Sequence, residues 1–281
     1  MRKTYARAAV RLARPILGAH SRVDRGIRLT RRSLLPALPT FLIIGATRSG
    51  TSWLRVQLDR HPDVALPPDE IRYFDFWLFR SIGWYGSHYR GLEAVAARGD
   101  KSPTYLRLSP DRIRLIRRLM PEVRLVLMVR DPVERAWSGY RRRHAESEHV
   151  SLEDFAQAQA RSRSEARFQG LDPASEGRYV PAVVNWLQVF PRERLLAVPF
   201  DRIVSDPRRL VQEVLVHIGV DPMKYPWEEL SGEKINATPP MEMPDDVRTY
   251  LSRHFAGERE ALATLLRSGP LWREDMTHVA P

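Results

Sequence analysis

Runs of unbroken hydrophobic residues limit the fold of this chain more than any other feature. Residues 41–44 and, apart from Arg124, residues 123–129 are apolar without alternation, and a glycine loop or a helix-start signal comes soon after each run. Continuous hydrophobicity indicates strands that are buried on both faces, as in a parallel sheet. A third short strand is expected over residues 195–198. Strands that alternate with helices predict an α/β layered domain.

Helical patterns occupy the segments between and after these strands. Ser109 and Pro110 predict a helix start, because serine favours the cap and proline the first turn. The residues from Ser151 to Asp154 form a capping pattern. Three helices are expected to begin near residue 51, at 110 and at 151. Further helices are expected over about residues 132–145, 179–190 and 206–218, and one long helix over about 244–266.

The composition removes several classes of site. The 281 residues include no cysteine, which excludes a disulfide framework, a thiolate nucleophile and a Cys-ligated cluster or zinc. The eight histidines show no HExxH spacing, so we expect no metal ion. No run reaches the roughly 18 apolar residues of a membrane-spanning helix.

The positive charge is concentrated at the N-terminus. Residues 1–40 hold ten basic residues and one acidic residue, so they carry +9 of the net charge of +11. The rest is nearly neutral, which argues against a nucleic-acid partner. We expect a poorly ordered basic arm over residues 1–37 and one domain over residues 38–281. A peripheral contact of the arm with an anionic membrane surface stays open.

An anion-binding loop is the strongest functional signal. Residues 45–52 read GATRSGTS and connect the first strand to a helix. Small residues there let backbone N–H groups converge on an anion, and the helix N-terminus favours negative charge. A Walker A loop would carry lysine at the position of Thr51. Its absence disfavours a P-loop small-molecule kinase, which we keep as one alternative; a non-catalytic anion- or glycan-binding protein is the other.

The loop resembles the 5′-phosphosulfate loop of sulfotransferases that use PAPS (3′-phosphoadenosine 5′-phosphosulfate). Residues 129–140, VRDPVERAWSGY, are similar to the segment that holds the 3′-phosphate in that family. The eight-residue interval from Arg130 to Ser138 matches the family. The resemblance implies a P-loop-like three-layer fold, with a central, mostly parallel sheet between helices.

Two further segments resemble the heparan-sulfate-type sulfotransferases and their bacterial relatives. Residues 68–75, PDEIRYFD, followed by GWY at 83–85, match the segment that carries the general base of that group. Residues 100–105, DKSPTY, match a Glu-Lys-Ser/Thr-Pro-x-Tyr element. Asp69 stands where the relatives carry lysine, and Arg72 where they often carry histidine.

The resemblance assigns a role to each candidate residue. Glu70 would take the proton from an acceptor hydroxyl as it attacks sulfur, and Arg48 and Lys101 would neutralise charge on the leaving group. His88 and Asp75 are the alternatives for the base. The expected nucleotide-binding residues are Arg48, Ser49, Gly50, Thr51, Ser52, Trp53, Arg130, Ser138 and Lys234. Trp53 would stack on adenine, with packing in the core as its alternative. Arg141, Arg142 and Arg143 form either a solvated helix end or one wall of an acceptor cleft.

The implied function is transfer of a sulfuryl group from PAPS to a hydroxyl of a carbohydrate, a glycolipid or a secondary metabolite, with PAP (3′-phosphoadenosine 5′-phosphate) as product and no metal. Because PAPS is made in the cytosol, we expect a cytoplasmic enzyme. The sequence does not distinguish O- from N-sulfation, does not identify the acceptor, and does not indicate an oligomeric state.

Overall fold

A central parallel sheet organises the chain. The computed structural model describes residues 38–144, 151–158, 177–232 and 241–267, and within them five strands form one sheet in the order β2-β3-β1-β4-β5. Each pair of neighbouring strands is parallel. The strands are β1 (Phe41–Gly45), β2 (Val64–Ala65), β3 (Ala97–Lys101), β4 (Arg124–Val129) and β5 (Leu195–Pro199).

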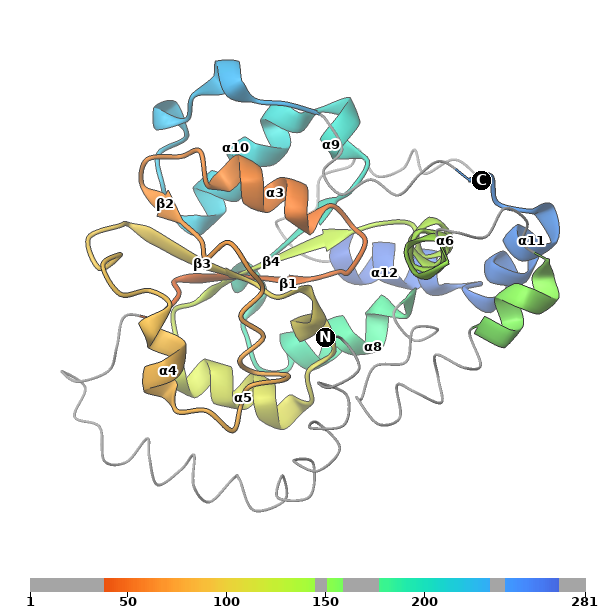
Figure 1. The fold of residues 1–281 in the computed structure, drawn as a ribbon, viewed down its shortest axis with the longest axis horizontal. Coiled ribbons are helices and arrows are strands. Elements are labelled where there is room, and N and C mark those ends of the chain that lie inside the picture. The colour runs from red at the N-terminus through yellow and green to blue at the C-terminus, as the bar shows by residue number, and fades with distance from the viewer. Residues whose placement is uncertain (1–37, 145–150, 159–176, 233–240, 268–281) are drawn as a thin grey trace.

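Helices connect the strands and cover both faces of the sheet (Figure 1). The α-helices are α3 (Thr51–Leu58), α4 (Ile82–Ser87), α5 (Pro110–Leu119), α6 (Pro132–Arg143), α8 (Tyr179–Leu187), α9 (Arg202–Ser205), α10 (Pro207–Ile218), α11 (Asp245–His254) and α12 (Glu258–Arg267). Short 3-10 turns are η3 (Pro103–Arg107), η5 (Arg192–Arg194), η6 (Pro222–Lys224) and η7 (Trp227–Glu229). Helices between parallel strands are what such crossovers require.

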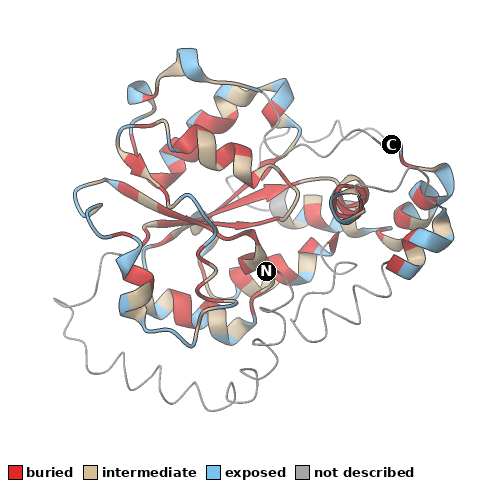
Figure 2. Cartoon of the chain, in the orientation of Figure 1, coloured by how far each residue is buried: buried red, intermediate tan, exposed pale blue. Residues whose placement is uncertain are grey.

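Alternate residues of β1 serve two separate cores, so the strand is buried throughout (Figure 2). Leu42 and Ile44 pack with α5, α8 and the aromatic segment around α4. Phe41 and Ile43 pack with α3 and α10 on the opposite face. This period of two, with both faces covered, explains why the sequence of β1 is apolar without interruption.

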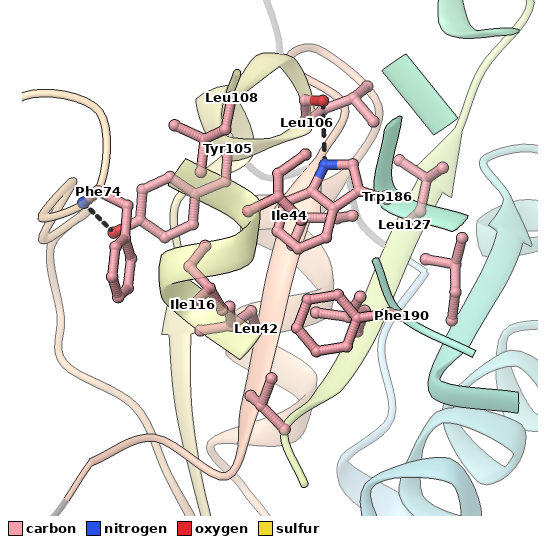
Figure 3. Packing of buried hydrophobic residues seen from close by; sticks show 14 of the residues in the cluster. Leu42, Ile44, Phe74, Tyr105, Leu106, Leu108, Ile116, Leu127, Trp186 and Phe190 are labelled. Carbon is pink, nitrogen blue, oxygen red and sulfur yellow. Dashed lines mark hydrogen bonds between the residues drawn. The ribbon is translucent and has the colours of Figure 1, made fainter. Parts of the chain in front are cut away.

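The first of these cores contains large aromatic side chains whose polar atoms are satisfied (Figure 3). Trp186 from α8 is fully buried, and its Nε1 donates to the carbonyl oxygen of Leu106 at 3.1 Å. The hydroxyl of Tyr105 accepts from the backbone N–H of Phe74 at 3.3 Å. A third cluster joins α6, residues 152–158 and α11 beside the sheet.

The structure confirms most of the predicted elements, divides one predicted helix into two, and contains elements that were not predicted, among them β2, β3 and α4. The three predicted strands form, and Ser109 and Pro110 precede and open α5 as expected. The prediction of one long C-terminal helix was wrong, because the segment is divided into α11 and α12. Gly257 lies between them with a φ of 78°, a left-handed conformation that interrupts an α-helix. Strand β3 was missed because its sequence, ARGDK, is polar.

Within the described residues, no helix is long and apolar enough to cross a membrane.

Candidate active site

The predicted anion-binding loop, residues 45–52, begins at the last residue of β1. Gly50 caps α3 with a φ of 81°, and Arg48 has a φ of 62°, so two loop residues adopt the left-handed region. The first intrahelical bond runs from the N–H of Leu54 to the carbonyl oxygen of Gly50 at 3.0 Å. The N–H groups of the preceding turn therefore have no partner inside the helix, as at any helix start. They lie where an anion would be favoured.

The glycine at position 50 is needed for packing as well as for conformation. A Cβ on Gly50 would lie 2.4 Å from Cδ1 of Ile203 and 3.1 Å from Cδ2 of Phe200. These two residues follow β5, so the loop is held against the neighbouring end of the sheet. The close approach fixes the position of the loop relative to β4 and β5.

Arg48, Arg130 and Ser138 lie together, which joins the two predicted phosphate-binding segments. Nε of Arg48 donates to Oγ of Ser138 at 3.2 Å, across 90 residues of sequence. Nη1 of Arg130 donates to the carbonyl oxygen of Arg48 at 3.2 Å. The guanidinium of Arg130 also lies over the ring of Phe200, 4.5 Å from its centroid. The interval from Arg130 to Ser138 thus corresponds to one spatial cluster.

This cluster concentrates positive charge in a partly desolvated place. The pKa of Arg48 is lowered, first by burial and then by the charges of Arg142, Arg130 and Arg141. Burial is also the main cause that lowers the pKa of Arg130. Like charges that are held close together disfavour one another, so an anion placed among them would be bound favourably. The arginines at the end of α6 therefore contribute to the field around the loop.

Glu70 and Lys101 form an ion pair at the same edge of the sheet. Nζ of Lys101 lies 2.9 Å from Oε1 of Glu70. Lys101 ends β3, and its register partner on the parallel strand β1 is Ile43, two residues before the loop. The side chain of Lys101 is 9% exposed and that of Glu70 is 37% exposed. A solvent-borne hydroxyl can therefore reach the carboxylate, while the ammonium group stays fixed.

The alternative bases have other roles in this structure. Asp75 pairs with Arg72, whose Nη2 lies 2.7 Å from Oδ2, and its side chain is 11% exposed. His88 follows α4 and packs edge-on against Trp84, with ring centroids 4.7 Å apart. Asp75 thus also pairs with a cation, but it is much less exposed than Glu70, and His88 contacts an aromatic ring.

Two of the predicted nucleotide-binding residues are buried, and a third lies outside the described residues. Trp53 is 2% exposed, packs in the core between the sheet and α10, and its Nε1 donates to the carbonyl oxygen of Ser231 at 2.7 Å. This favours the core interpretation, because little of the indole is open to a base. Ser49 is fully buried, so its hydroxyl is not open to solvent. Lys234 lies outside the described residues.

Sequence reasoning missed two aromatic residues that support Arg130. Besides Phe200, Tyr179 contributes through its hydroxyl, which donates to the carbonyl oxygen of Arg130 at 3.0 Å. Phe200 could have been found, because it directly follows β5 and ligands of parallel sheets gather at the carboxyl ends of strands. Tyr179 has no such signal, since it reaches the site from the start of α8. Among the described residues, no group of three or more His, Cys, Asp or Glu side chains is placed to hold a metal ion.

Known proteins are similar to this chain in sequence. Heparan sulfate glucosamine 3-O-sulfotransferase 6 of Mus musculus is 32% identical over 193 residues, which are 65% of this chain and 52% of that protein. The bifunctional heparan sulfate N-deacetylase/N-sulfotransferase 1 of Caenorhabditis elegans is 24% identical over 296 residues, 92% of this chain and 33% of that protein. The chain spans about half the length of the first of these curated relatives and a third of the second.

A solved structure and a family model agree with these relatives. The crystal structure of a sulfotransferase from Alicyclobacillus acidocaldarius superposes with a TM-score of 0.67 at 27% identity, over 82% of this chain and 96% of that chain. The model of the sulfotransferase domain matches residues 38–253, which include the anion-binding loop, the ion pair of Glu70 and Lys101, and the cluster around Arg130. The chain therefore belongs to the sulfotransferase domain family.

Proposed function

We propose that this protein transfers a sulfuryl group from PAPS to a hydroxyl group of a carbohydrate, with Glu70 as the general base. The observation that carries the proposal is the ion pair of Glu70 and Lys101, in which Nζ of Lys101 lies 2.9 Å from Oε1 of Glu70. The pair lies at the end of the sheet from which the predicted anion-binding loop also starts. A base and a fixed cation beside an anion site are the groups that transfer of a charged sulfuryl group requires.

The two anionic ends of the donor match two sets of residues. Backbone N–H groups of the loop and of the first turn of α3, with the hydroxyls of Thr51 and Ser52, would hold the 5′-phosphate. Arg130 and Ser138 would hold the 3′-phosphate. Arg48 connects the two sets through its bond to Ser138, and its lowered pKa reflects a place where cations are crowded. The residues present therefore fit a nucleotide with phosphate groups at both positions.

The chemical step needs only groups that this chain provides. The acceptor oxygen forms a bond to sulfur while the bond from sulfur to the 5′-phosphate oxygen breaks. The hydroxyl proton passes to the carboxylate of Glu70, and PAP leaves. Lys101 and Arg48 would stabilise the negative charge that develops on the leaving group. Lys101 is well placed because its contact with Glu70 keeps it at the site before the substrate arrives.

Carbohydrate is the acceptor class that the relatives favour. The mouse relative is named for 3-O-sulfation of heparan sulfate glucosamine. The exposed side of Glu70 fits an acceptor that approaches from solvent. The test is transfer of radiolabelled sulfate from PAPS to a panel of oligosaccharides, glycolipids and small hydroxyl compounds. Transfer to saccharides supports the proposal, and transfer only to compounds without sugar would contradict the acceptor class.

Isothermal titration calorimetry with PAP, ATP and GTP tests the donor. We expect PAP to bind, and Arg130→Ala to weaken binding about tenfold or more, because a charged hydrogen bond to phosphate is lost. Arg114→Ala is the matched control, since Arg114 is 61% exposed on α5 and pairs with Asp111, away from the anion-binding loop. Binding of Mg·ATP without binding of PAP would instead indicate a kinase.

A further inference from the structure

A buried carboxylate that the proposed chemistry does not use lies next to Lys101. Asp100 is fully buried, and three hydroxyl groups donate to it. Oδ2 accepts from the hydroxyls of Tyr85 at 2.8 Å and Tyr105 at 2.9 Å, and Oδ1 accepts from Oγ of Ser102 at 2.7 Å. Among the described residues, no basic side chain pairs with it. A buried charge without a cation is costly, so the three hydrogen bonds to Asp100 are needed to offset that cost.

Two of these hydroxyls also accept hydrogen bonds from the backbone of the segment that follows Glu70. Oγ of Ser102 accepts from the backbone N–H of Arg72 at 3.0 Å. The hydroxyl of Tyr105 accepts from the backbone N–H of Phe74 at 3.3 Å (Figure 3). A hydroxyl has one proton to donate, so its donation to Asp100 turns the oxygen lone pairs toward these N–H groups. One carboxylate therefore orients two acceptors toward the backbone of residues 72–74.

The segment needs such support, because its backbone is unusual. Arg72 has a φ of 54°, a left-handed conformation that a residue with a side chain adopts only when its surroundings impose it. Glu70 lies two residues before this turn. On the other side of Asp100, Lys101 contacts Glu70, and the backbone N–H of Ser102 donates to the carbonyl oxygen of Ile43 at 3.2 Å. The end of β3 thus connects β1 with the segment of the base.

We propose that Asp100 is a positioning residue: through the hydroxyls of Ser102 and Tyr105 it holds the backbone at Arg72 and Phe74, and this keeps Glu70 beside Lys101. The role of Glu70 in this inference rests on the proposed function. Asp100 itself touches no reacting atom. Its two hydroxyl relays fix where the carboxylate of the base lies relative to the end of β3.

The charge of Asp100 gives this inference a pH dependence. Burial is the largest cause that raises the pKa of Asp100, to about 6. The titratable groups that face it are Tyr85 in α4, Tyr89 after α4, Tyr105 in η3 and Asp75 in the loop after Glu70. A protonated Asp100 has an O–H group that must donate a hydrogen bond. This donation competes with the hydrogen bonds that Asp100 accepts from Ser102 and Tyr105. Turnover should therefore fall as the pH drops through about 6.

Hydrogen exchange tests the relays without any assay of activity. In Asp100→Asn, the amides of Arg72 and Phe74 should exchange faster, because an amide group cannot accept from all three hydroxyls. Ser102→Ala should expose the amide of Arg72 and Tyr105→Phe that of Phe74, and Ser102→Thr should restore protection at Arg72. Tyr89→Phe is the control, since its hydroxyl contacts the carbonyl oxygen of Gly99 instead. Unchanged exchange at both amides in all these variants would overturn the inference.

Kinetics then separate positioning from binding. We expect Asp100→Asn to keep PAP affinity and lower kcat about tenfold or more, and to lack the acid limb near pH 6. Equal kcat and an equal pH profile in the variant and the wild type would contradict the inference. If wild-type protein neither binds PAP nor turns over PAPS, the proposed function fails, whereas the exchange results still decide the role of Asp100. If Asp100→Asn does not fold, the variants at Ser102 and Tyr105 decide the matter.

Discussion

Glu70 has to remain reachable by the acceptor and yet stay in a fixed position. Its side chain is 37% exposed, and one oxygen contacts Lys101 at 2.9 Å. We predict that Glu70→Gln leaves PAP affinity within a few-fold of wild type, because the nucleotide residues are elsewhere, and lowers turnover by about two orders of magnitude, the usual effect of losing a general base. Single-turnover kinetics with calorimetry would measure both.

Asp69 provides the matched control for this prediction. It is exposed and precedes Glu70 directly. Asp69→Asn removes the same charge from the same loop but should leave turnover within a few-fold of wild type. If Asp69→Asn slows turnover as much as Glu70→Gln does, the loss reflects the charge of the loop and not proton transfer at Glu70. Retained turnover in Glu70→Gln would move the base to His88 or Asp75.

At the scale of elements, the turn from β1 into α3 depends on Gly50. Its φ of 81° disfavours any side chain, and a Cβ would lie 2.4 Å from Ile203. We predict that Gly50→Ala lowers the free energy of unfolding by about 2 to 4 kcal/mol, from backbone strain together with overpacking. It should also weaken PAP binding, because the loop must move away from Ile203. Urea unfolding and calorimetry would test both effects.

Gly91 separates the two causes. It has a φ of 84°, but a Cβ there would meet nothing within 4 Å. Gly91→Ala should therefore cost only the strain, about 1 kcal/mol, with PAP affinity unchanged. Equal losses of stability in the two variants would show that close packing of the loop against Ile203 and Phe200 contributes nothing.

At the scale of the whole molecule, one buried histidine links stability to pH. His217 is 8% exposed, and burial lowers its pKa from 6.5 to about 4. Between these values the unfolded chain binds a proton that the folded chain does not, so stability falls as the pH drops from 6.5 toward 4. The loss from this residue should total about 3 kcal/mol. The raised pKa of Asp100 acts in the opposite direction below pH 6.

Comparison of two histidine variants separates the contribution of His217 to the pH dependence of stability from that of Asp100. His217 bonds to the carbonyl oxygen of Leu125 at 3.0 Å, and glutamine can keep a donor there. His217→Gln should flatten the fall in melting temperature between pH 6.5 and 4, whatever its effect at pH 8. His88→Gln, a change at an exposed histidine, should leave the pH profile as it is in wild type. A profile unchanged by His217→Gln would refute the assignment.

The N-terminal arm provides a second test at this scale. The described chain starts at Leu38, whose carbonyl oxygen accepts from Nε of Arg98 at 3.3 Å, and Thr40 also bonds to Arg98. We predict that deletion of residues 2–35 leaves PAP affinity and turnover on a water-soluble acceptor nearly unchanged, and abolishes co-sedimentation with anionic vesicles, if the full chain shows it. Loss of folding or of PAP binding would place the domain boundary before residue 38.

Features that depend on neighbours along the chain could be predicted from the sequence alone. The unit of strand, loop and helix at residues 41–58, and the run from Arg130 into α6, follow from local hydrophobic patterns and helix-start signals. The resemblance to sulfotransferases rested on these same short segments. Local order of this kind can be derived from sequence, because it depends on residues that are close along the chain.

Which distant side chains meet could not be predicted from the sequence. The polar strand β3 lies in the sheet because its neighbours bury it, and its register with β1 brings Lys101 beside the loop. Trp53 shows the same limit, since an apolar helix face does not reveal whether the core or a ligand covers it. The relays from Asp100 join β3, η3 and the loop after Glu70. Register and packing between elements depend on contacts across the whole fold, which no local pattern records.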